Sequence, residues 1–378
     1  MKRLLAFSLA LALLGPGLSG HAHIFPGFLP LTPVAYQAPF GTGKLDQYTD
    51  VWSDDNRLLL TSRDAGVAVM ELSAAGVPRH LSTYAPAAPS SFSSVTASGN
   101  TAYLASEAAG GVHLVDLSDL LTPRLLSRID ATNGGFDKPE RSALDGDHLY
   151  LVSTHSSRVK VFDVGDPKHP VLVRELETGD PDGLTDIVVT GEKVYVVGSG
   201  SGKNDAEGTV YIFDAKPDGS LGNPLRAMET GFASNSLGVT EDGRFLVVSH
   251  RKRGGGVSLF DLSATPEPQR VARVDASDFE INGYSAGRVT VADQVAYVAW
   301  HQGGVQVIDL DTLDILGVPQ RVGVFGTASG ISPLAGFVGN VSAFPHVGPT
   351  RVLLVDSKWG LYVVDATRVL PMPEEESE

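Results

Sequence analysis

Cysteine does not occur in this chain of 378 residues, so neither a disulfide nor a lipid-modified cysteine can stabilise or anchor it. Basic side chains are also few, because 29 lysines and arginines stand against 44 aspartates and glutamates and give a formal net charge of −15. Such a surface repels nucleic-acid phosphates and acidic membranes. We therefore expect no nucleic-acid partner, and a fold that is stabilised by the burial of apolar surface.

The apolar run near the start of the chain is too short to cross a bilayer as a permanent helix. It covers residues 4–14, follows a basic pair at residues 2 and 3, and precedes the small residues Gly20 and Ala22. This pattern is typical of a secretory signal peptide over residues 1–22. We expect an exported protein, periplasmic, on the cell surface or secreted, with no transmembrane anchor after cleavage and a solvated acidic tail at residues 371–378.

Glycine and proline, by contrast, are abundant, with 42 and 23 copies, and favour many short strands joined by tight turns. One phrase recurs seven times: a turn residue, a β-branched or apolar run, and an acidic residue. The copies are residues 66–71, 111–116, 158–163, 209–214, 256–261, 304–309 and 360–365. Their acidic ends are 45 to 56 residues apart and most simply accept backbone amides in turns.

Each phrase is the third of four strand signals, which we name A to D. Four strands per repeat of this length are typical of a propeller blade, and the apolar third strand suits a position between neighbouring blades. The sequence predicts an all-β, seven-bladed β-propeller of four-stranded antiparallel blades within residues 47–370. The blades are expected at about 47–84, 92–130, 141–178, 184–230, 236–275, 286–326 and 340–370.

The seventh repeat ends after strand C and lacks an outer strand. Within the N-terminal segment 23–46, residues 31–36 form a strand signal that has no local partner, and its proline is acceptable on an outermost strand. We predict that this strand completes the last blade and closes the ring, which hides a sheet edge that would otherwise promote aggregation.

The phrases GVHLVDLSDLLTPRLL, RVKVFDVGDPKHPVLV and GVQVIDLDTL resemble those of LVIVD-repeat proteins, a family of exported or surface bacterial propellers. The resemblance covers about residues 47–370. It implies a propeller in the cell envelope or outside the cell, and it carries over no catalytic motif.

Short motifs of enzymes occur but lack their structural context. Gly283 to Gly287 matches the G-x-S-x-G pattern around Ser285, yet no helix is expected after it, so a strained nucleophile turn is not predicted. Gly41 to Lys44 lacks the rest of a phosphate-binding loop. Three tryptophans are too few and too unevenly placed for a quinoprotein propeller. We therefore assign no catalytic residue.

Two acidic loops offer the oxygen ligands that calcium prefers, although neither has the ordered spacing of a calcium loop. The weak candidate ligands are Asp180, Asp182, Asp186, Asp205 and Glu207. Solvated turns are the alternative interpretation. We expect no cofactor, with calcium as the one metal that these residues leave open.

The loops between strands B and C share one face of the ring with the loops that lead from strand D to the next strand A. In blades 5, 6, 7 and 1 these B–C loops are rich in basic residues, which indicates a flat anionic or sugar-acid ligand that pairs with a cation and stacks on an indole. The hypothetical ligand-binding residues are Arg63, His250, Trp300, His301, Lys358 and Trp359. The alternative interpretation is that these basic residues bind no ligand and only keep the loops soluble.

The leading functional hypothesis is a non-enzymatic module that binds a protein or an anionic or carbohydrate ligand through this face, because a rigid ring presents many loops at little cost in ordering. An exported hydrolase, lactonase-like with a metal or serine site at the channel mouth, is the first alternative. A purely structural envelope component is the second. The fold alone does not choose among them.

Overall fold

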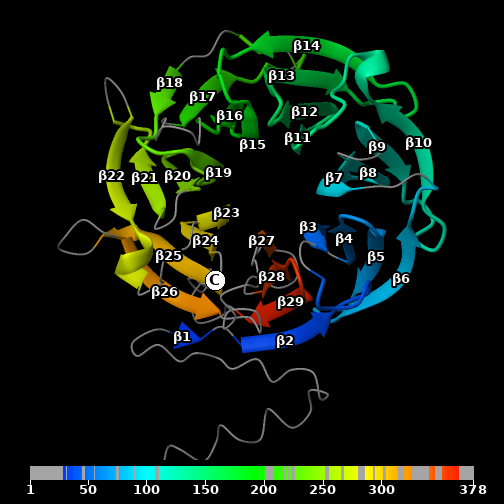
Figure 1. Ribbon diagram of the computed structural model, residues 1–378, viewed down its shortest axis with the longest axis horizontal. Coiled ribbons are helices and arrows are strands. Elements are labelled where there is room, and N and C mark those ends of the chain that lie inside the picture. The colour runs from blue at the N-terminus through cyan, green and yellow to red at the C-terminus, as the bar shows by residue number, and fades with distance from the viewer. Residues whose placement is uncertain are drawn as a thin grey trace, which may run out of the picture.

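Seven sheets surround a central axis in the computed structural model, and each runs from an inner strand to an outer one (Figure 1). The structure describes residues 29–30, 32–44, 47–54, 56–73, 76–87, 91–106, 110–200, 208–216, 218–219, 221–222, 226–251, 255–264, 268–279, 286–292, 294–300, 304–313, 319–325, 340–344 and 351–365. The predicted seven-bladed, all-β propeller of four-stranded antiparallel blades is confirmed. The predicted signal peptide lies outside the described residues.

The strands follow one another from inner to outer within each of the first six blades. Blades 1 to 3 contain β3 (Tyr48–Ser53), β4 (Arg57–Ser62), β5 (Gly66–Leu72) and β6 (Pro78–Tyr84); β7 (Phe92–Ser98), β8 (Thr101–Ser106), β9 (Val112–Asp116) and β10 (Arg124–Ile129); and β11 (Arg141–Asp145), β12 (His148–Ser153), β13 (Ser156–Asp163) and β14 (Val171–Glu177).

Blades 4 to 6 repeat this order. They contain β15 (Leu184–Thr190), β16 (Lys193–Gly198), β17 (Thr209–Asp214) and β18 (Arg226–Glu229); β19 (Ser234–Val239), β20 (Phe245–His250), β21 (Val257–Asp261) and β22 (Gln269–Val274); and β23 (Ala286–Ala292), β24 (Val295–Trp300), β25 (Gly304–Leu313) and β26 (Pro319–Phe325). Blade 7 contains β27 (Asn340–Phe344), β28 (Arg351–Asp356) and β29 (Gly360–Asp365), with β2 (Thr32–Gln37) outermost.

Helical structure is minor in the described part of the chain. It consists of two short 3-10 turns, η2 (Ala131–Asn133) and η3 (Ala276–Phe279), each of which follows an outer strand. None of the helical segments found there has the length and hydropathy that a bilayer crossing requires.

The second strand of each blade, and the third strand of every blade except blade 3, are buried on both faces over most of their length, because each sheet is sandwiched between two others. In β4, for example, Leu58, Leu59 and Leu60 are all inaccessible to solvent although their side chains alternate between the two faces. The buried apolar residues form seven clusters, one at each junction between neighbouring blades. The continuous apolar runs noticed in the sequence are therefore explained by burial between blades.

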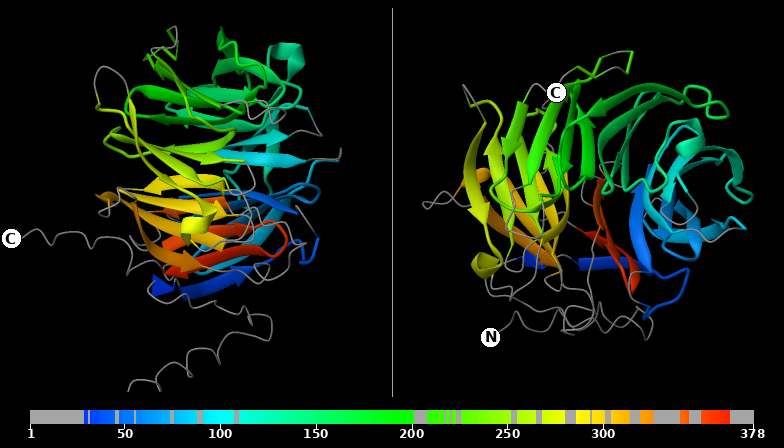
Figure 2. Two further views of the ribbon diagram at one scale, coloured as in Figure 1. Left: turned by 60° about the vertical axis from the view of Figure 1, so that its left-hand side comes forward. Right: turned by 45° about the horizontal axis from the view of Figure 1, so that its top comes forward.

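The predicted closing strand is confirmed. β2 pairs antiparallel with β29, with Thr32 opposite Asp365 and Gln37 opposite Leu361, so the first and last parts of the chain share a sheet (Figure 2). Ala35 of β2 packs in the apolar cluster between blades 7 and 1. A shorter strand that was not predicted, β1 (Leu29–Pro30), pairs parallel with β26 of blade 6. The N-terminal segment thus crosses the outer edges of two blades.

The closing strand β2 also makes the same contact with strand C as strand D does in other blades. A glycine begins strand C in several blades at a point where a Cβ atom would meet a carbonyl oxygen of strand D. In blade 1 the Cβ at Gly66 would lie 2.3 Å from the Tyr84 oxygen, and in blade 7 the Cβ at Gly360 would lie 2.5 Å from the Gln37 oxygen. Two segments more than 300 residues apart in the sequence therefore reproduce a contact that other blades make within one repeat.

We predict that removal of residues 23–37 from the mature chain causes aggregation or a lower melting temperature. The deletion leaves β29 with an unpaired edge and removes Ala35 from the apolar cluster between blades 7 and 1, which exposes part of that cluster. Thermal unfolding and size-exclusion chromatography measure the effect. A truncated protein that is as soluble and as stable as the mature chain contradicts the closure.

A milder variant in the same experiment isolates the contact between the two strands. Gly360→Ala places a methyl group against Gln37, whereas Gly41→Ala changes a glycine that also has a positive φ, +86°, but has nothing within 4 Å of its Cβ position. The first variant should melt at the lower temperature, and equal melting temperatures speak against the contact.

Candidate functional site

The last position of strand B is buried in all seven blades. Its occupants are Ser62, Ser106, Ser153, Gly198, His250, Trp300 and Asp356. The residue after it in blade 1, Arg63, is exposed. In blade 5 the next residue, Arg251, is exposed as well, whereas Ser357 of blade 7 is buried. We call the face that carries the B–C and D–A loops the B–C face.

His250 and Trp300, two of the hypothetical ligand-binding residues, occupy this buried position, and both have 0% exposure. The Nε2 atom of His250 is 2.8 Å from Ser258 Oγ, and Trp300 packs in the apolar cluster between blades 5 and 6. Neither side chain offers a surface to a ligand, and we leave both out of the candidate site. His301 lies outside the described residues.

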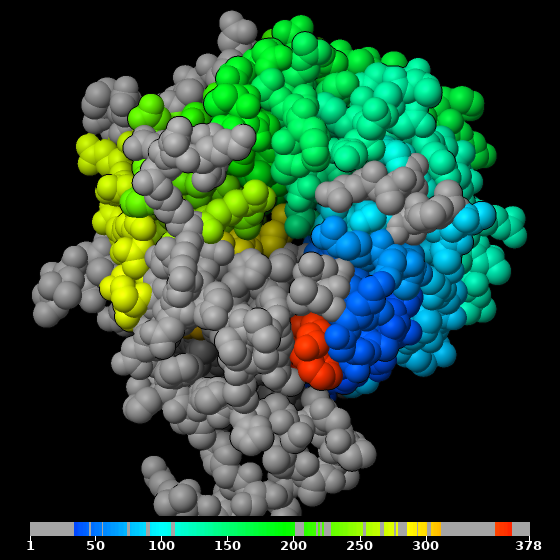
Figure 3. All heavy atoms as spheres, viewed as in Figure 1, coloured from blue at the N-terminus to red at the C-terminus, as the bar shows by residue number. Residues whose placement is uncertain are grey.

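Residues 38–44 and 47, which lie between β2 and β3, contact blades 7 and 1 next to basic residues of both. The amide of Gly43 donates to the Lys358 oxygen at 3.0 Å, and the amide of Arg63 donates to the Gln47 oxygen at 3.0 Å. Lys44, in the same segment, forms an ion pair with Asp64. Figure 3 shows parts of blade 7, in red, and blade 1, in blue, side by side on one face of the molecule.

We name Lys44, Arg63, Lys358 and Trp359 the junction patch. Asp356 accepts hydrogen bonds from the amides of Lys358 at 2.9 Å and Trp359 at 3.2 Å, which fixes the turn. Lys358 Nζ lies 5.4 Å from the ring centroid of Trp359, within range of a cation–π interaction, and the indole is half-buried. Asp64 at the surface and the buried Asp356 partly offset the three cations.

Lys44 was missed in the sequence because it was weighed only as a fragment of a phosphate-binding loop. The topology offered a better signal. D–A loops and B–C loops emerge on the same face, so the loop between the closing strand and blade 1 belongs beside the B–C turns of blades 7 and 1.

The three calcium candidates among the described residues do not form one cluster. Asp180 and Asp182 are close, because the amide of Asp182 donates to Asp180 Oδ1 at 3.1 Å, and burial raises the pKa of Asp180. Asp186 lies elsewhere, on inner strand β15, and Asp205 and Glu207 lie outside the described residues. Within the described ranges, no group of three or more histidine, cysteine, aspartate or glutamate side chains could hold a metal. A calcium site stays a prediction.

The inner strands place one polar residue from each blade at the same register, a position that the sequence analysis did not single out. In blade 1 it is Asp50, which precedes the residue paired with Leu60 of strand B. The seven residues at this register, here called the ring position, are Asp50, Ser94, Arg141, Asp186, Ser236, Arg288 and Asn340. In the sequence, most of them stand directly before Val, Ile or Leu at the start of a strand, a signal that the repeat alignment could have used.

Three ring-position side chains accept a hydrogen bond from the next blade. Asp50 accepts from the amide of Val95 at 3.1 Å, Asp186 from Leu237 at 3.3 Å, and Ser236 from Val289 at 3.2 Å. Each donor directly follows the ring position of its own blade. An inner strand has no neighbour on its channel side, so these amides would otherwise lack a partner in the sheet.

The four charged ring-position residues also pair with one another across the axis. Arg141 Nη1 donates to Asp50 Oδ2 at 2.9 Å and to the Ser93 oxygen at 2.9 Å. Arg288 Nη1 donates to Asp186 Oδ1 at 3.2 Å, and its Nη2 atom lies 3.8 Å from Asp50 Oδ1. The network connects blades 1, 3, 4 and 6 through two cations and two anions.

The environment of these arginines differs. Burial, together with the positive charge of Arg288, lowers the pKa of Arg141 below its ordinary value. Burial also acts to lower the pKa of Arg288, but the charges of Asp186 and Asp50 outweigh it and raise that pKa. Removing one partner of such a buried pair typically costs about 3–5 kcal/mol. We interpret the network as structural, because each of its charged groups is already paired with an opposite charge within the network.

Comparison with known families gives one match. The model of the choice-of-anchor I domain matches residues 140–255, which span blades 3 and 4 and the first two strands of blade 5. The match covers less than half of the chain. No curated protein matches the chain. The narrower resemblance to LVIVD-repeat proteins stays a prediction.

Solved structures similar to this chain in fold belong to proteins whose names indicate unrelated activities. Hydrazine synthase of Kuenenia stuttgartiensis is 14% identical with a TM-score of 0.64, covering 88% of this chain and 99% of that one. The WD40 propeller domain of Doa1 is 13% identical with a TM-score of 0.61, covering 93% and 99%. A putative 6-phosphogluconolactonase from Bacteroides fragilis is 14% identical with a TM-score of 0.58, covering 73% and 83%. At these identities the likeness concerns the fold alone.

Two fully buried histidines make the fold sensitive to acid. Burial, assisted by the positive charge of Arg128, lowers the pKa of His113 to about 4. Burial, assisted by Arg273 and Arg270, lowers the pKa of His250 to about 3. In the unfolded chain both rings titrate near 6.5. Between these values the unfolded state binds more protons than the folded state, so stability falls as the pH is lowered.

We predict that the melting temperature falls between pH 7 and pH 5, above the range in which most carboxylates titrate. By linkage each histidine costs about 2 kcal/mol of folding free energy at pH 5. The double variant His113→Gln, His250→Gln should show a flatter dependence of melting temperature on pH. His169→Gln, at a side chain that is 80% exposed, is the control and should keep the wild-type slope. Identical slopes for wild type and double variant contradict the assignment.

Proposed function

We propose that the protein is an exported, non-enzymatic binding module that recognises an anionic ligand through the junction patch on its B–C face. One observation carries this proposal. Backbone hydrogen bonds connect Gly43 to Lys358 of blade 7 and Gln47 to Arg63 of blade 1, and Lys44 pairs with Asp64 of blade 1. Lys358 lies over the half-buried indole of Trp359, so cations gather at this junction on a chain with a net charge of −15.

The ligand class follows from the chemistry of the patch. Guanidinium and ammonium groups pair with carboxylate, sulfate or phosphate oxygens through charge-assisted hydrogen bonds. The rest of the acidic surface repels an anion, so binding concentrates where the positive charges gather. The exposed setting means that salt screens the attraction. A sugar acid fits these conditions, because its carboxylate can pair with a cation while its ring packs against Trp359.

Export and surface location form part of the same proposal. The signal-like segment of residues 1–22, with Gly20 and Ala22 at the expected cleavage point, supports export. The choice-of-anchor description of the matched family model supports a protein held at or beyond the cell envelope.

A lactonase-like hydrolase is the competing proposal. Its support is the likeness to the putative 6-phosphogluconolactonase, which concerns the fold, and the pattern around Ser285, which lies outside the described residues. Stoichiometric calcium or zinc that survives dialysis, measured by metal analysis of the purified protein, favours the hydrolase over the binding module.

We predict that at least one anion in a panel of sugar acids, dicarboxylates and sulfated glycans binds the wild type, with an affinity that falls as salt rises. The triple variant Lys44→Ala, Arg63→Ala, Lys358→Ala should bind at least about tenfold more weakly, because it removes the paired charges. Isothermal titration calorimetry at two salt concentrations measures both effects.

The matched control changes three exposed cations elsewhere on the first three blades, Arg79→Ala, Arg124→Ala and Lys168→Ala, and so alters the net charge equally. Wild-type affinity in this control supports the junction patch. Equal binding by the wild type and the junction-patch variant, or equal weakening in the two triple variants, contradicts the proposal.

A further inference from the structure

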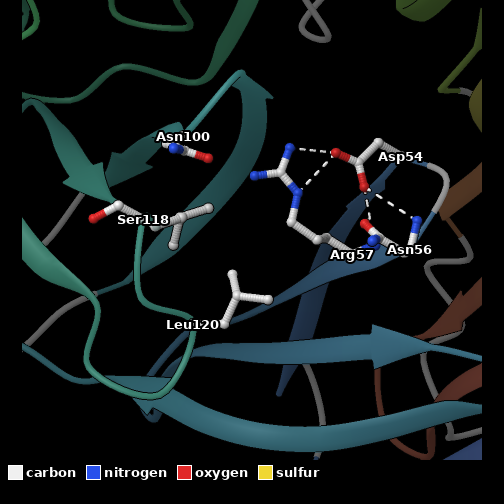
Figure 4. Close-up of a pocket in the computed structure, with 7 residues that line it drawn as sticks. Asp54, Asn56, Arg57, Asn100, Ser118 and Leu120 are labelled. Carbon is white, nitrogen blue, oxygen red and sulfur yellow. Dashed lines mark hydrogen bonds and ion pairs between the residues drawn. The ribbon is translucent and has the colours of Figure 1, made fainter.

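A pocket of about 450 Å³ lies between blades 1 and 2, away from the junction patch. One wall is the A–B turn of blade 1, with Asp54, Asn56 and Arg57. The other is formed by Asn100 in the A–B turn of blade 2 and by the residues that follow β9, among them Ser118 and Leu120. Figure 4 shows the two groups of side chains on opposite sides of the pocket.

The charged groups of the pocket neutralise each other. Arg57 Nε donates to Asp54 Oδ2 at 2.8 Å, its Nη2 atom pairs with the same carboxylate, and its Nη1 atom donates to the Gly99 oxygen of blade 2 at 2.7 Å. Burial acts to raise the pKa of Asp54, but the hydrogen bonds and charge of Arg57 outweigh it and keep that pKa below its ordinary value. The pair therefore presents a rigid, neutral wall that bridges two blades.

Two carboxamides face the pocket from different blades on backbone that is already fixed. The amide of Leu72 donates to the Asn56 oxygen at 2.7 Å, and the amide of Leu117 donates to the Asn100 oxygen at 2.8 Å. Within the residues that the structure describes, neither side-chain carboxamide bonds to another protein group. Each offers both donors and an acceptor. Leu117 and Leu120 add an apolar part to the lining.

We propose that this pocket binds a neutral saccharide. Alternating donors and acceptors from two asparagines match the vicinal hydroxyl groups of a sugar, and the apolar leucines suit the C–H face of its ring. The neutralised Asp54–Arg57 pair gives no preference for a charged ligand. The site is independent of the junction patch, so the molecule has one ligand site for an anion and another for an uncharged sugar.

The test uses the mature protein and a panel of glucose, galactose, mannose and N-acetylglucosamine with their di- to tetrasaccharides, measured by ligand-observed NMR and calorimetry. At least one saccharide should bind, with an affinity that is unchanged between low and high salt because no net charge is paired. The double variant Asn56→Ala, Asn100→Ala should bind at least about tenfold more weakly. Its melting temperature should stay close to that of the wild type, because both side chains are exposed.

Gln294→Ala is the matched control, because Gln294 holds the equivalent turn position in blade 6, where its backbone oxygen accepts from Leu310 at 2.8 Å. It should keep wild-type saccharide binding, as should the junction-patch triple variant. The inference is overturned if no saccharide of the panel binds, if the double variant binds as the wild type does, or if the junction-patch variant loses the sugar as well. Loss of anion binding alone bears only on the proposed function.

Discussion

The innermost strand of each blade has one edge without a neighbouring strand, and the ring depends on how the amides along that edge are satisfied. Ring-position residues supply hydrogen-bond acceptors for these amides across blade boundaries. The side chains of Asp50, Asp186 and Ser236 each accept a hydrogen bond from a backbone amide of the blade that follows. The same register carries Arg141 and Arg288, which pair with the two aspartates. Hydrogen bonds and ion pairs at the axis thus add to the burial of apolar side chains in the seven clusters between the blades.

This constraint bears on where the proposed ligand sites lie. The charged side chains at the axis are paired with one another. The last residue of strand B is buried in every blade. The two proposed sites lie instead in turns and loops farther from the axis, which the rigid blades hold in place. The junction patch and the pocket between blades 1 and 2 are both of this kind. Each uses residues from two neighbouring blades and backbone hydrogen bonds that fix the turn.

The architecture could be predicted from the sequence because it depends on repetition. Seven copies of one phrase and one unpartnered strand gave the blade number and the closing strand β2, observed at Thr32–Gln37. The candidate site could be predicted only in part, because in blades 1 and 5 a buried residue at the end of strand B is followed directly by an exposed one. His250 and Trp300 are the last residues of their B strands and are buried, whereas Arg63 directly follows its B strand and is exposed. The ring position and the pocket depend on contacts between blades, which periodicity within one repeat does not reveal.

Hydrogen exchange of the amide of Val289 tests the central claim most directly. Ser236→Ala removes the hydroxyl that accepts this amide at 3.2 Å, whereas Ser94→Ala makes the same change at the ring position of blade 2. The account predicts slow exchange at Val289 in the wild type and in Ser94→Ala, and clearly faster exchange in Ser236→Ala. Exchange at Val289 as fast as in exposed loops, or unchanged by the loss of Ser236, would contradict it.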